Sequence, residues 1–259
     1  MYKVRLVLFL VIYHFMLMGT PIYGQQRTKV SVAAASDLYK VLEEVKVDFE
    51  AKHSELSLQL SFGASGSLTA QIQHGAPFDI FLSADEDLPT KLYNAGLSDS
   101  SPFLYTIGNL TLWVRRDLKL DLERDKWKTL LSSTISKISI ANPKVAPYGK
   151  AAETALRRAG IYDQIKSKLI FGDNISHAAQ FLYAGAAEAG IISPSQVNNV
   201  ALSREGLVWK LPLHLYPPIR QTGVIIKRSN CLREARIFQS FLTSRDGQMI
   251  FVRHGFGKI

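Results

Sequence analysis

Short apolar runs alternate with amphipathic segments along most of this chain, and this alternation restricts the fold more than any other feature. The run Val30–Ala35 is typical of a buried strand. Between Leu38 and Phe49, apolar side chains recur at the spacing of one helix face, with charged side chains on the opposite face. Strands that alternate with helices predict an α/β fold of parallel sheets covered by helices on both faces. A chain of 259 residues is long enough for one large domain or for two lobes with separate cores.

The same pattern continues to the end of the chain. Strands are expected at 56–62, 79–84, 109–114, 137–143, 168–172, 189–193 and 221–227, and helices at 67–75, 86–96, 148–160, 175–185 and 232–251. The last helix is expected to be interrupted around Asp246 and Gly247. No proline- or glycine-rich linker separates these elements, so two lobes would have to be joined by strand-like crossovers. The candidates for these crossovers lie near 108–109 and 221–223.

The first 24 residues have the pattern of a secretory signal peptide. Lys3 and Arg5 precede an apolar run from Leu6 to Met18, and the small residue Gly24 ends the segment that follows. A membrane anchor is the alternative interpretation, but an apolar run of about 13 residues is too short to span a bilayer comfortably. We therefore expect export, with cleavage near Gly24.

Charge and cysteine content narrow the class of protein. Removal of the signal takes away Lys3 and Arg5, so 29 basic side chains remain against 22 acidic ones, a net charge of +7. A basic exported protein suits an anionic ligand or simply a solvated basic surface, whereas no basic stripe with interleaved aromatics indicates nucleic-acid binding. The only cysteine, Cys231, forms no internal disulfide and does not follow the apolar run, so no lipid anchor site is present. An exported protein without such an anchor is expected in a Gram-negative periplasm.

Four predicted helices begin in the same way, with small or hydroxyl side chains directly after a strand. Ligands of α/β proteins bind beyond the carboxyl ends of parallel strands. A helix start offers unpaired backbone N–H groups and the positive end of the helix dipole, so several converging starts form an anion site without any lysine or arginine. Taken alone, Ser36 or Ser65 is better explained as an ordinary N-cap, but four such starts in one exported chain favour a site. The four segments are 36–37, 65–67, 147–149 and 173–176.

Catalytic and metal-binding motifs are incomplete. Gly63 and Ser65 match half of the G-x-S-x-G motif of serine hydrolases, but Ser67 stands where the second glycine is required. Around Lys150 the sequence is similar to a phosphate-binding loop, but Ala151 follows in place of serine or threonine. The histidines are isolated and show no metal-ligand spacing, so we expect no catalytic residue, no cofactor and no metal ion held by side chains. The three tryptophans are assigned to the core or its margin: Trp113, Trp127 and Trp209.

Four stretches of the sequence resemble the periplasmic molybdate-binding proteins of molybdate ABC importers. They are VSVAAASDL, SFGASGSLTAQIQHGAPFDIFLSAD, IANPKVAPYGKAAETAL and AGIIS, in this order, and the resemblance extends over about residues 28–259. It implies a type II periplasmic binding fold, in which two α/β lobes, each a mostly parallel sheet flanked by helices, hold an oxyanion between them. With the crossovers expected above, the first lobe would comprise 25–108 and 222–259, and the second 109–221.

The resemblance also implies which groups bind the oxyanion. Ser36 and Ser65 would each donate a hydroxyl and a backbone N–H, whereas Tyr148 and Ile175 would donate backbone N–H groups. Some members of the family add a tyrosine hydroxyl at the end of a later strand, and Ser193 stands at that position here. Because serine is shorter, Ser193 would act through water or not at all.

The function implied is capture of molybdate, and of the similarly sized tungstate, by a monomeric periplasmic receptor that delivers the ion to the membrane permease of an ABC importer. A receptor for another tetrahedral oxyanion, such as sulfate or phosphate, is the nearest alternative. A secreted hydrolase with Ser65 as nucleophile and an interaction module that binds no small ion are alternatives from other classes.

Overall fold

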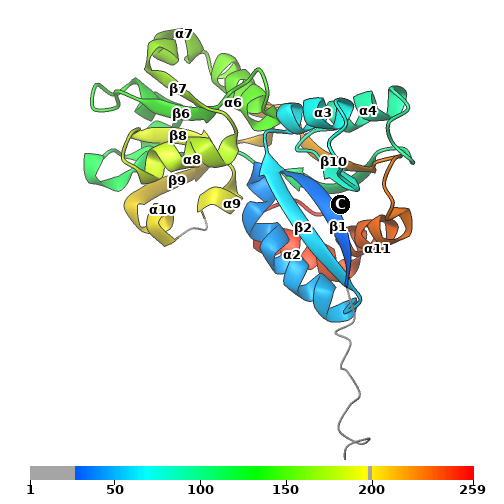
Figure 1. The fold of residues 1–259 in the computed structure, drawn as a ribbon. Coiled ribbons are helices and arrows are strands. Elements are labelled where there is room, and N and C mark those ends of the chain that lie inside the picture. Colours follow the sequence, from blue (N-terminus) through cyan, green and yellow to red (C-terminus); the bar gives the residue numbers. More distant parts are fainter. Residues whose placement is uncertain (1–26, 198–199) are drawn as a thin grey trace, which may run out of the picture.

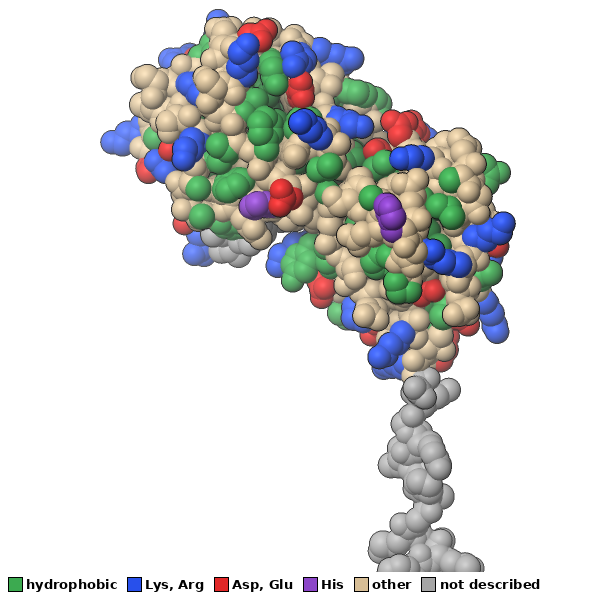
Figure 2. Space-filling view, turned by 45° about the horizontal axis from the view of Figure 1, so that its top comes forward, with side chains coloured by type: hydrophobic (Ala, Val, Ile, Leu, Met, Phe, Trp, Pro, Cys, Tyr) green, Lys and Arg blue, Asp and Glu red, His purple; other side chains and the backbone are tan. Residues whose placement is uncertain are grey.

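Two five-stranded sheets form the centres of the two halves of the protein (Figure 1). The computed structural model describes residues 27–197 and 200–259, so the expected signal peptide lies outside the described residues. Figure 2 shows the halves as two distinct masses joined near the middle, with lysine and arginine side chains scattered over the visible face. No helix of the described segments is long and apolar enough to cross a membrane.

The first sheet has the strand order β2-β1-β3-β10-β4. β1 runs parallel to β2 and to β3, whereas β10 runs antiparallel to β3 and to β4. Because β1 and β2 are parallel, their carboxyl ends lie at the same edge, where Ala35 pairs with Gly63. The strands are β1 (Thr28–Ala35), β2 (Leu56–Gly63), β3 (Ile80–Leu82), β4 (Phe103–Gly108) and β10 (Ile219–Ile225).

The second sheet repeats this arrangement with the order β7-β6-β8-β5-β9. β6 is parallel to β7 and β8, and β5 is antiparallel to β8 and β9. The carboxyl ends of β6 and β7 therefore also lie together, with Ala141 opposite Gly172. The strands are β5 (Thr111–Arg115), β6 (Ile138–Ala141), β7 (Leu169–Gly172), β8 (Ala189–Ile192) and β9 (Gly206–Lys210).

The chain passes between the sheets twice, between β4 and β5 and between β9 and β10. Strands β5 and β10, which follow these passages, run against their neighbours, so both sheets are mixed rather than mostly parallel. The α/β class with two helix-flanked sheets is confirmed, and the antiparallel part is the refinement that the structure adds. Strands β4 and β9 were not predicted from the sequence.

Helices cover both faces of the first sheet. Leu68 and Ile72 of α3 and Leu92 of α4 pack on the face that carries Ala33 and Phe81. The opposite face is covered by α2, α11 and α12, and the ring of Phe49 in α2 lies 5.1 Å from that of Phe238 and 5.5 Å from that of Phe241, both in α11. Burial of one such ring contributes about 1.5–3 kcal/mol. These helices are α2 (Tyr39–Lys52), α3 (Ser65–Gln73), α4 (Asp87–Asn94), α11 (Leu232–Thr243) and α12 (Arg245–Arg253).

The C-terminal helical segment breaks at Ser244, not around Asp246 and Gly247 as expected. Ser244 is the N-cap of α12, where its hydroxyl accepts a hydrogen bond from the N–H of Gly247 at 3.2 Å. A serine that caps a helix is a strong signal for a helix start, whereas a glycine inside a helix is a weaker signal for a break. The break was therefore expected two residues too far along the chain.

In the second half, α6 and α8 pack on β6, and α8 also contacts β7 and β8. The indole of Trp113 is fully buried and donates to the carbonyl of Leu202 at 2.8 Å. Trp127 and Trp209 lie at the margin of the core, edge to face, so the assignment of the three tryptophans is confirmed. The helices are α5 (Leu122–Asp125), α6 (Pro147–Arg158), α7 (Tyr162–Ile165), α8 (Ile175–Tyr183), α9 (Pro194–Val197) and α10 (Val200–Glu205), and the 3-10 turns are η1 (Ser36–Leu38), η2 (Arg116–Leu118), η3 (Lys126–Leu131), η4 (Lys166–Lys168) and η5 (Leu213–Leu215).

Candidate anion-binding site between the two halves

Four helix starts, two from each half, meet around one small cavity. Four of the residues expected to bind the ligand line it: Ser36, Ser65, Tyr148 and Ile175. They follow the carboxyl ends of β1, β2, β6 and β7, the position at which α/β proteins bind ligands. The cavity measures about 10 Å³, room for one water-sized sphere. A tetraoxo anion is larger, so its walls have to separate to admit one.

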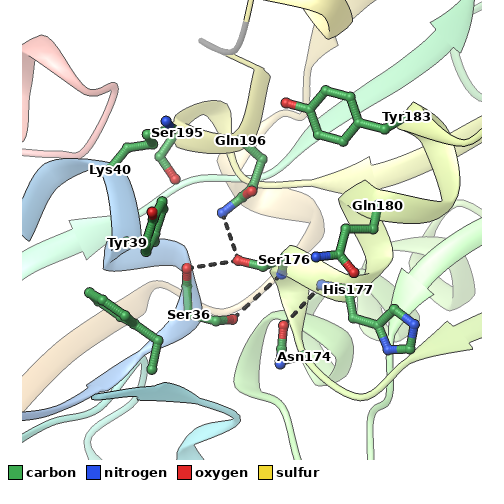
Figure 3. A pocket seen from close by; sticks show the side chains of 11 residues that line it. Ser36, Tyr39, Lys40, Asn174, Ser176, His177, Gln180, Tyr183, Ser195 and Gln196 are labelled. Atoms are coloured by element: carbon green, nitrogen blue, oxygen red, sulfur yellow. Dashed lines mark hydrogen bonds between the residues drawn. The ribbon is translucent and has the colours of Figure 1, made fainter. Parts of the chain in front are cut away.

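Ser36 connects the first half to the start of α8. Its carbonyl accepts a hydrogen bond from the hydroxyl of Ser176 at 2.9 Å, and its hydroxyl accepts from the backbone N–H of Ser176 at 3.5 Å (Figure 3). Ser36 is the first residue of η1, and the N-cap is Ala35. The alternative that Ser36 is an ordinary N-cap is therefore wrong.

Ser65 is held at the start of α3 by a hydrogen bond to another strand end. It is 1% exposed, and its Oγ accepts from the backbone N–H of Ala84 at 3.0 Å. Ala64 is the N-cap of α3, so Ser65 is not an ordinary N-cap either. A hydroxyl whose oxygen already accepts a bond keeps its proton for another acceptor, which makes Ser65 a donor available to the cavity.

Tyr148 and Ile175 contribute helix starts from the second half. Pro147 is the first residue of α6 and has no N–H, which leaves the Tyr148 N–H among the donors of the first turn. Gly149 lets this turn lie against β6, because a Cβ there would be 2.3 Å from the carbonyl oxygen of Ala141. Ile175 begins α8, and the side chain of its N-cap, Asn174, accepts from the N–H of His177 at 2.9 Å.

Ser193 is not part of the cavity lining. It is completely buried, and its hydroxyl lies 2.8 Å from that of Ser195, which donates to the carbonyl of Asp37 at 2.9 Å. Ser193 thus supports the chain behind the cavity wall, and its expected contact with the ligand stays a prediction.

Asp37 is the lining residue that the sequence reasoning missed as a functional group. It is 1% exposed, and its Oδ2 accepts from Nε2 of Gln221 at 2.6 Å. Burial raises the pKa of Asp37 to about 6, although hydrogen bonds from Gln221 and Tyr148 lower it. The available signal was an acidic residue directly beside Ser36 at a predicted helix start.

Gln221 is also part of this buried network, and it joins the two halves. Its Nε2 donates to the hydroxyl of Tyr148 at 3.0 Å, and its Oε1 accepts from the hydroxyl of Tyr105 at 3.0 Å. Burial and the nearby Asp37 raise the pKa of Tyr148 well above its usual value, so its hydroxyl remains a neutral donor.

A wider groove of about 530 Å³ opens beside the cavity and shares Ser36 and Asn174 with it. Tyr39 and Lys40 at the start of α2 form one wall, and side chains of α8 form the other (Figure 3). Among the residues described for this groove, Lys40 and His177 are the basic ones and none is acidic. The groove therefore offers an anion an approach without a repelling carboxylate.

The surroundings of Ser65 do not support hydrolysis. No histidine, glutamate or lysine belongs to the described lining of the cavity, and Asp37 is bonded to Gln221 rather than to a catalytic histidine. No group of three or more potential metal-ligating side chains occurs in the described part of the chain. Apart from Asp37, the polar groups of the site are neutral donors, which suits binding without bond cleavage.

Comparisons with known proteins identify the family. Residues 30–257 match the family model described as bacterial extracellular solute-binding protein. The molybdate-binding protein ModA of Azotobacter vinelandii is 35% identical over 233 residues, 90% of this chain and 91% of that protein. ModA of Rhodobacter capsulatus is 33% identical and covers 88% of each chain. The solved structure of the periplasmic molybdate-binding protein from A. vinelandii aligns with a TM-score of 0.80 and 31% identity, over 88% of this chain and 98% of that one. The chain therefore belongs to the bacterial extracellular solute-binding proteins and is a homologue of the molybdate-binding proteins ModA.

Proposed function

We propose that this protein captures molybdate or tungstate between its two halves and delivers the ion to the permease of an ABC importer. The observation that carries this proposal is that four helix starts converge on one cavity. Among the residues described as lining that cavity, none is a lysine, arginine or histidine. The family consists of binding proteins, so the chain is not an enzyme. The ModA proteins of A. vinelandii and R. capsulatus align with about nine tenths of this chain, and the A. vinelandii structure has the same fold.

The chemistry of the cavity fits a fully ionised tetrahedral oxyanion. Such an ion carries only acceptors, and the helix starts provide backbone N–H groups together with the positive ends of the helix dipoles. The hydroxyls of Ser36 and Ser65 add donors whose protons rotate toward the ion. A protonated phosphate would bring its own donor to an array of donors, which costs about 1–3 kcal/mol for each unpaired group. Sulfate would have to be rejected by size.

Capture would proceed by closure of two lobes around the ion. One lobe would comprise 25–108 together with 222–259, and the other would comprise 109–221. Direct hydrogen bonds already join the walls, for example from the N–H of Gly66 to the carbonyl of Val145 at 3.1 Å. An oxyanion that bridges both walls would add further contacts, which favours the closed state. Before capture, the signal peptide would be cleaved near Gly24 and the protein released into the periplasm. After capture, the closed monomer would dock on the permease.

The test is the thermal stability of residues 25–259 with molybdate, tungstate, sulfate or phosphate. A ligand at about one hundred times its dissociation constant stabilises by about 2.7 kcal/mol, which raises the melting temperature by a few degrees. Molybdate and tungstate should produce this rise, and the other two anions should not. A rise with sulfate or phosphate alone would reassign the ligand, and no rise with any of the four would contradict an oxyanion receptor.

A further inference from the structure

Asp37 is the acidic residue among those described as lining the cavity, and the helix starts and serine hydroxyls around it are donors. Its Oδ2 is bonded to Gln221, but its Oδ1 is buried and has no hydrogen-bond partner in the described chain. A buried carboxylate oxygen without a partner is costly, and such an orphan points to a group or a proton that completes it. The inference below rests on the oxyanion-binding function proposed above.

The groups that face Asp37 are uncharged, although hydrogen bonds from Gln221 and Tyr148 partly stabilise its charged form. Tyr105 of β4 and Tyr148 of α6 present neutral hydroxyls, and the charge of Asp37 raises the pKa of both. Gln221 of β10 presents an uncharged amide, and Ser195 of α9 bonds only the backbone carbonyl of Asp37. Asp85, beyond β3, is a second acid on the same side, since it also raises the pKa of Tyr105. No lysine, arginine or histidine within 27–197 or 200–259 is paired with Asp37.

A dianion in this cavity would lie beside the Asp37 carboxyl. Two like charges at such short range in a buried site strongly disfavour each other, so one of them has to be neutralised. Molybdate and tungstate are weak bases at neutral pH, whereas Asp37 already titrates close to neutrality because it is buried. The proton therefore goes to Asp37, and it converts the orphaned acceptor into one more donor.

We propose that Asp37 is protonated when the oxyanion is bound and donates a hydrogen bond from Oδ1 to an oxyanion oxygen, so that binding takes up one proton from solvent. Oδ2 keeps its bond from Gln221 while the walls of the cavity separate to admit the ion. Asp37 thereby acts as a specificity-determining residue, because a neutral carboxylic acid donor suits an ion that carries only acceptors.

The consequence is that affinity depends on pH over a range in which the ligand itself does not titrate. Above the pKa of the unliganded Asp37, each rise of one pH unit should weaken binding by up to about tenfold. Asp37→Asn places an amide N–H₂ where the protonated acid would donate and an amide oxygen where Gln221 donates. This variant should bind molybdate independently of pH and, above about pH 8, at least as tightly as the wild type.

The experiment is titration calorimetry of the mature protein with sodium molybdate at about pH 7 and about pH 8.5, in buffers that differ in ionisation enthalpy. The dependence of the observed heat on the buffer gives the number of protons taken up per bound ion. Asp37→Asn is the test variant, and Asp85→Asn is the control, since Asp85 is a half-buried acid whose pKa is also raised by burial but which does not line the cavity.

Uptake of close to one proton at the higher pH, lost in Asp37→Asn and kept in Asp85→Asn, is the expected result. The inference is overturned if wild-type binding is equally tight at both pH values with no proton uptake, a measurement that needs no variant. It is also overturned if uptake persists in Asp37→Asn. Failure of the wild type to bind molybdate at either pH would instead contradict the proposed function.

Discussion

The hydroxyl of Ser65, at the start of α3, accepts a hydrogen bond at 3.0 Å from the backbone N–H of Ala84, which lies in the segment after β3. This bond fixes the position of the oxygen, and Thr69 in turn donates to the carbonyl of Ser65 at 2.8 Å. The helix start is thus held from two sides, while the hydroxyl proton of Ser65 remains free to turn toward the cavity. A preset donor of this kind loses little entropy when it binds a ligand.

Ser65→Ala should weaken molybdate binding by about 1.5–3 kcal/mol, roughly 10- to 100-fold, because it removes one donor to a charged oxyanion. It should also lower the free energy of unfolding by about 1 kcal/mol, since the N–H of Ala84 loses its partner. Calorimetry and urea unfolding measure the two effects. Ser67→Ala, an exposed serine in the same helical turn, is the control and should change neither. An unaltered dissociation constant in Ser65→Ala would show that this hydroxyl does not contact the ion.

Gly149→Ala should damage the start of α6. The added Cβ would be 2.3 Å from the carbonyl oxygen of Ala141, so the first turn of the helix has to move away from β6. Overpacking of this kind costs about 1–3 kcal/mol, and the Tyr148 N–H would move with the turn. We expect a lower melting temperature and weaker binding together. Lys150→Ala alters the next, exposed residue and should leave both unchanged; full affinity in Gly149→Ala would remove the Tyr148 N–H from the site.

Ser176→Ala tests the direct contact between the two halves. It removes the hydroxyl that donates to the carbonyl of Ser36 and accepts from the amide of Gln196. Loss of one such bond should destabilise the closed form by about 0.5–1.5 kcal/mol. The expected result is a larger radius of gyration of the unliganded protein by small-angle X-ray scattering, with a return to the wild-type value at saturating molybdate. Identical scattering of the two unliganded proteins would mean that this bond does not control closure.

The free energy of unfolding of the unliganded protein should depend on pH because of Asp37. Its pKa is about 6 when folded, against a usual value of 3.8, so the folded state holds this proton more tightly than the unfolded chain does. Asp37 therefore lowers the free energy of unfolding as pH rises from about 4 to about 6, by roughly 2–3 kcal/mol, and the loss persists above that range.

Relative to the wild type, Asp37→Asn should gain stability by about this amount between pH 4 and pH 7, because asparagine does not titrate. Urea unfolding of both proteins across this range is the measurement. Asp163→Asn, which removes an acid that is exposed on the surface, serves as the control. A constant difference for Asp37→Asn would mean that its carboxyl titrates alike in the folded and unfolded chains.

The sequence predicted the elements of the fold whose signal is local. The strand Val30–Ala35 and the helix after it follow from apolar spacing, and the structure has a strand at Thr28–Ala35 and a helix at Tyr39–Lys52. The resemblance to molybdate-binding proteins rested on contiguous motifs and is confirmed by the relatives. The edge strand β9 escaped prediction because its side chains are only partly buried and its apolar signal is correspondingly weak.

Strand direction and the state of Asp37 were decided only by the tertiary structure. The periodicity of a strand reports which side chains are buried but not which way its neighbour runs, so the antiparallel β5 and β10 could not be foreseen. Likewise, the sequence showed that four helices begin with small or hydroxyl residues, but their convergence depends on how two separately built sheets meet. The charge of Asp37 depends on its burial and on hydrogen bonds from Gln221 and Tyr148, which are distant in the chain. Burial and hydrogen bonding by such partners are non-local, and only the folded chain brings them together.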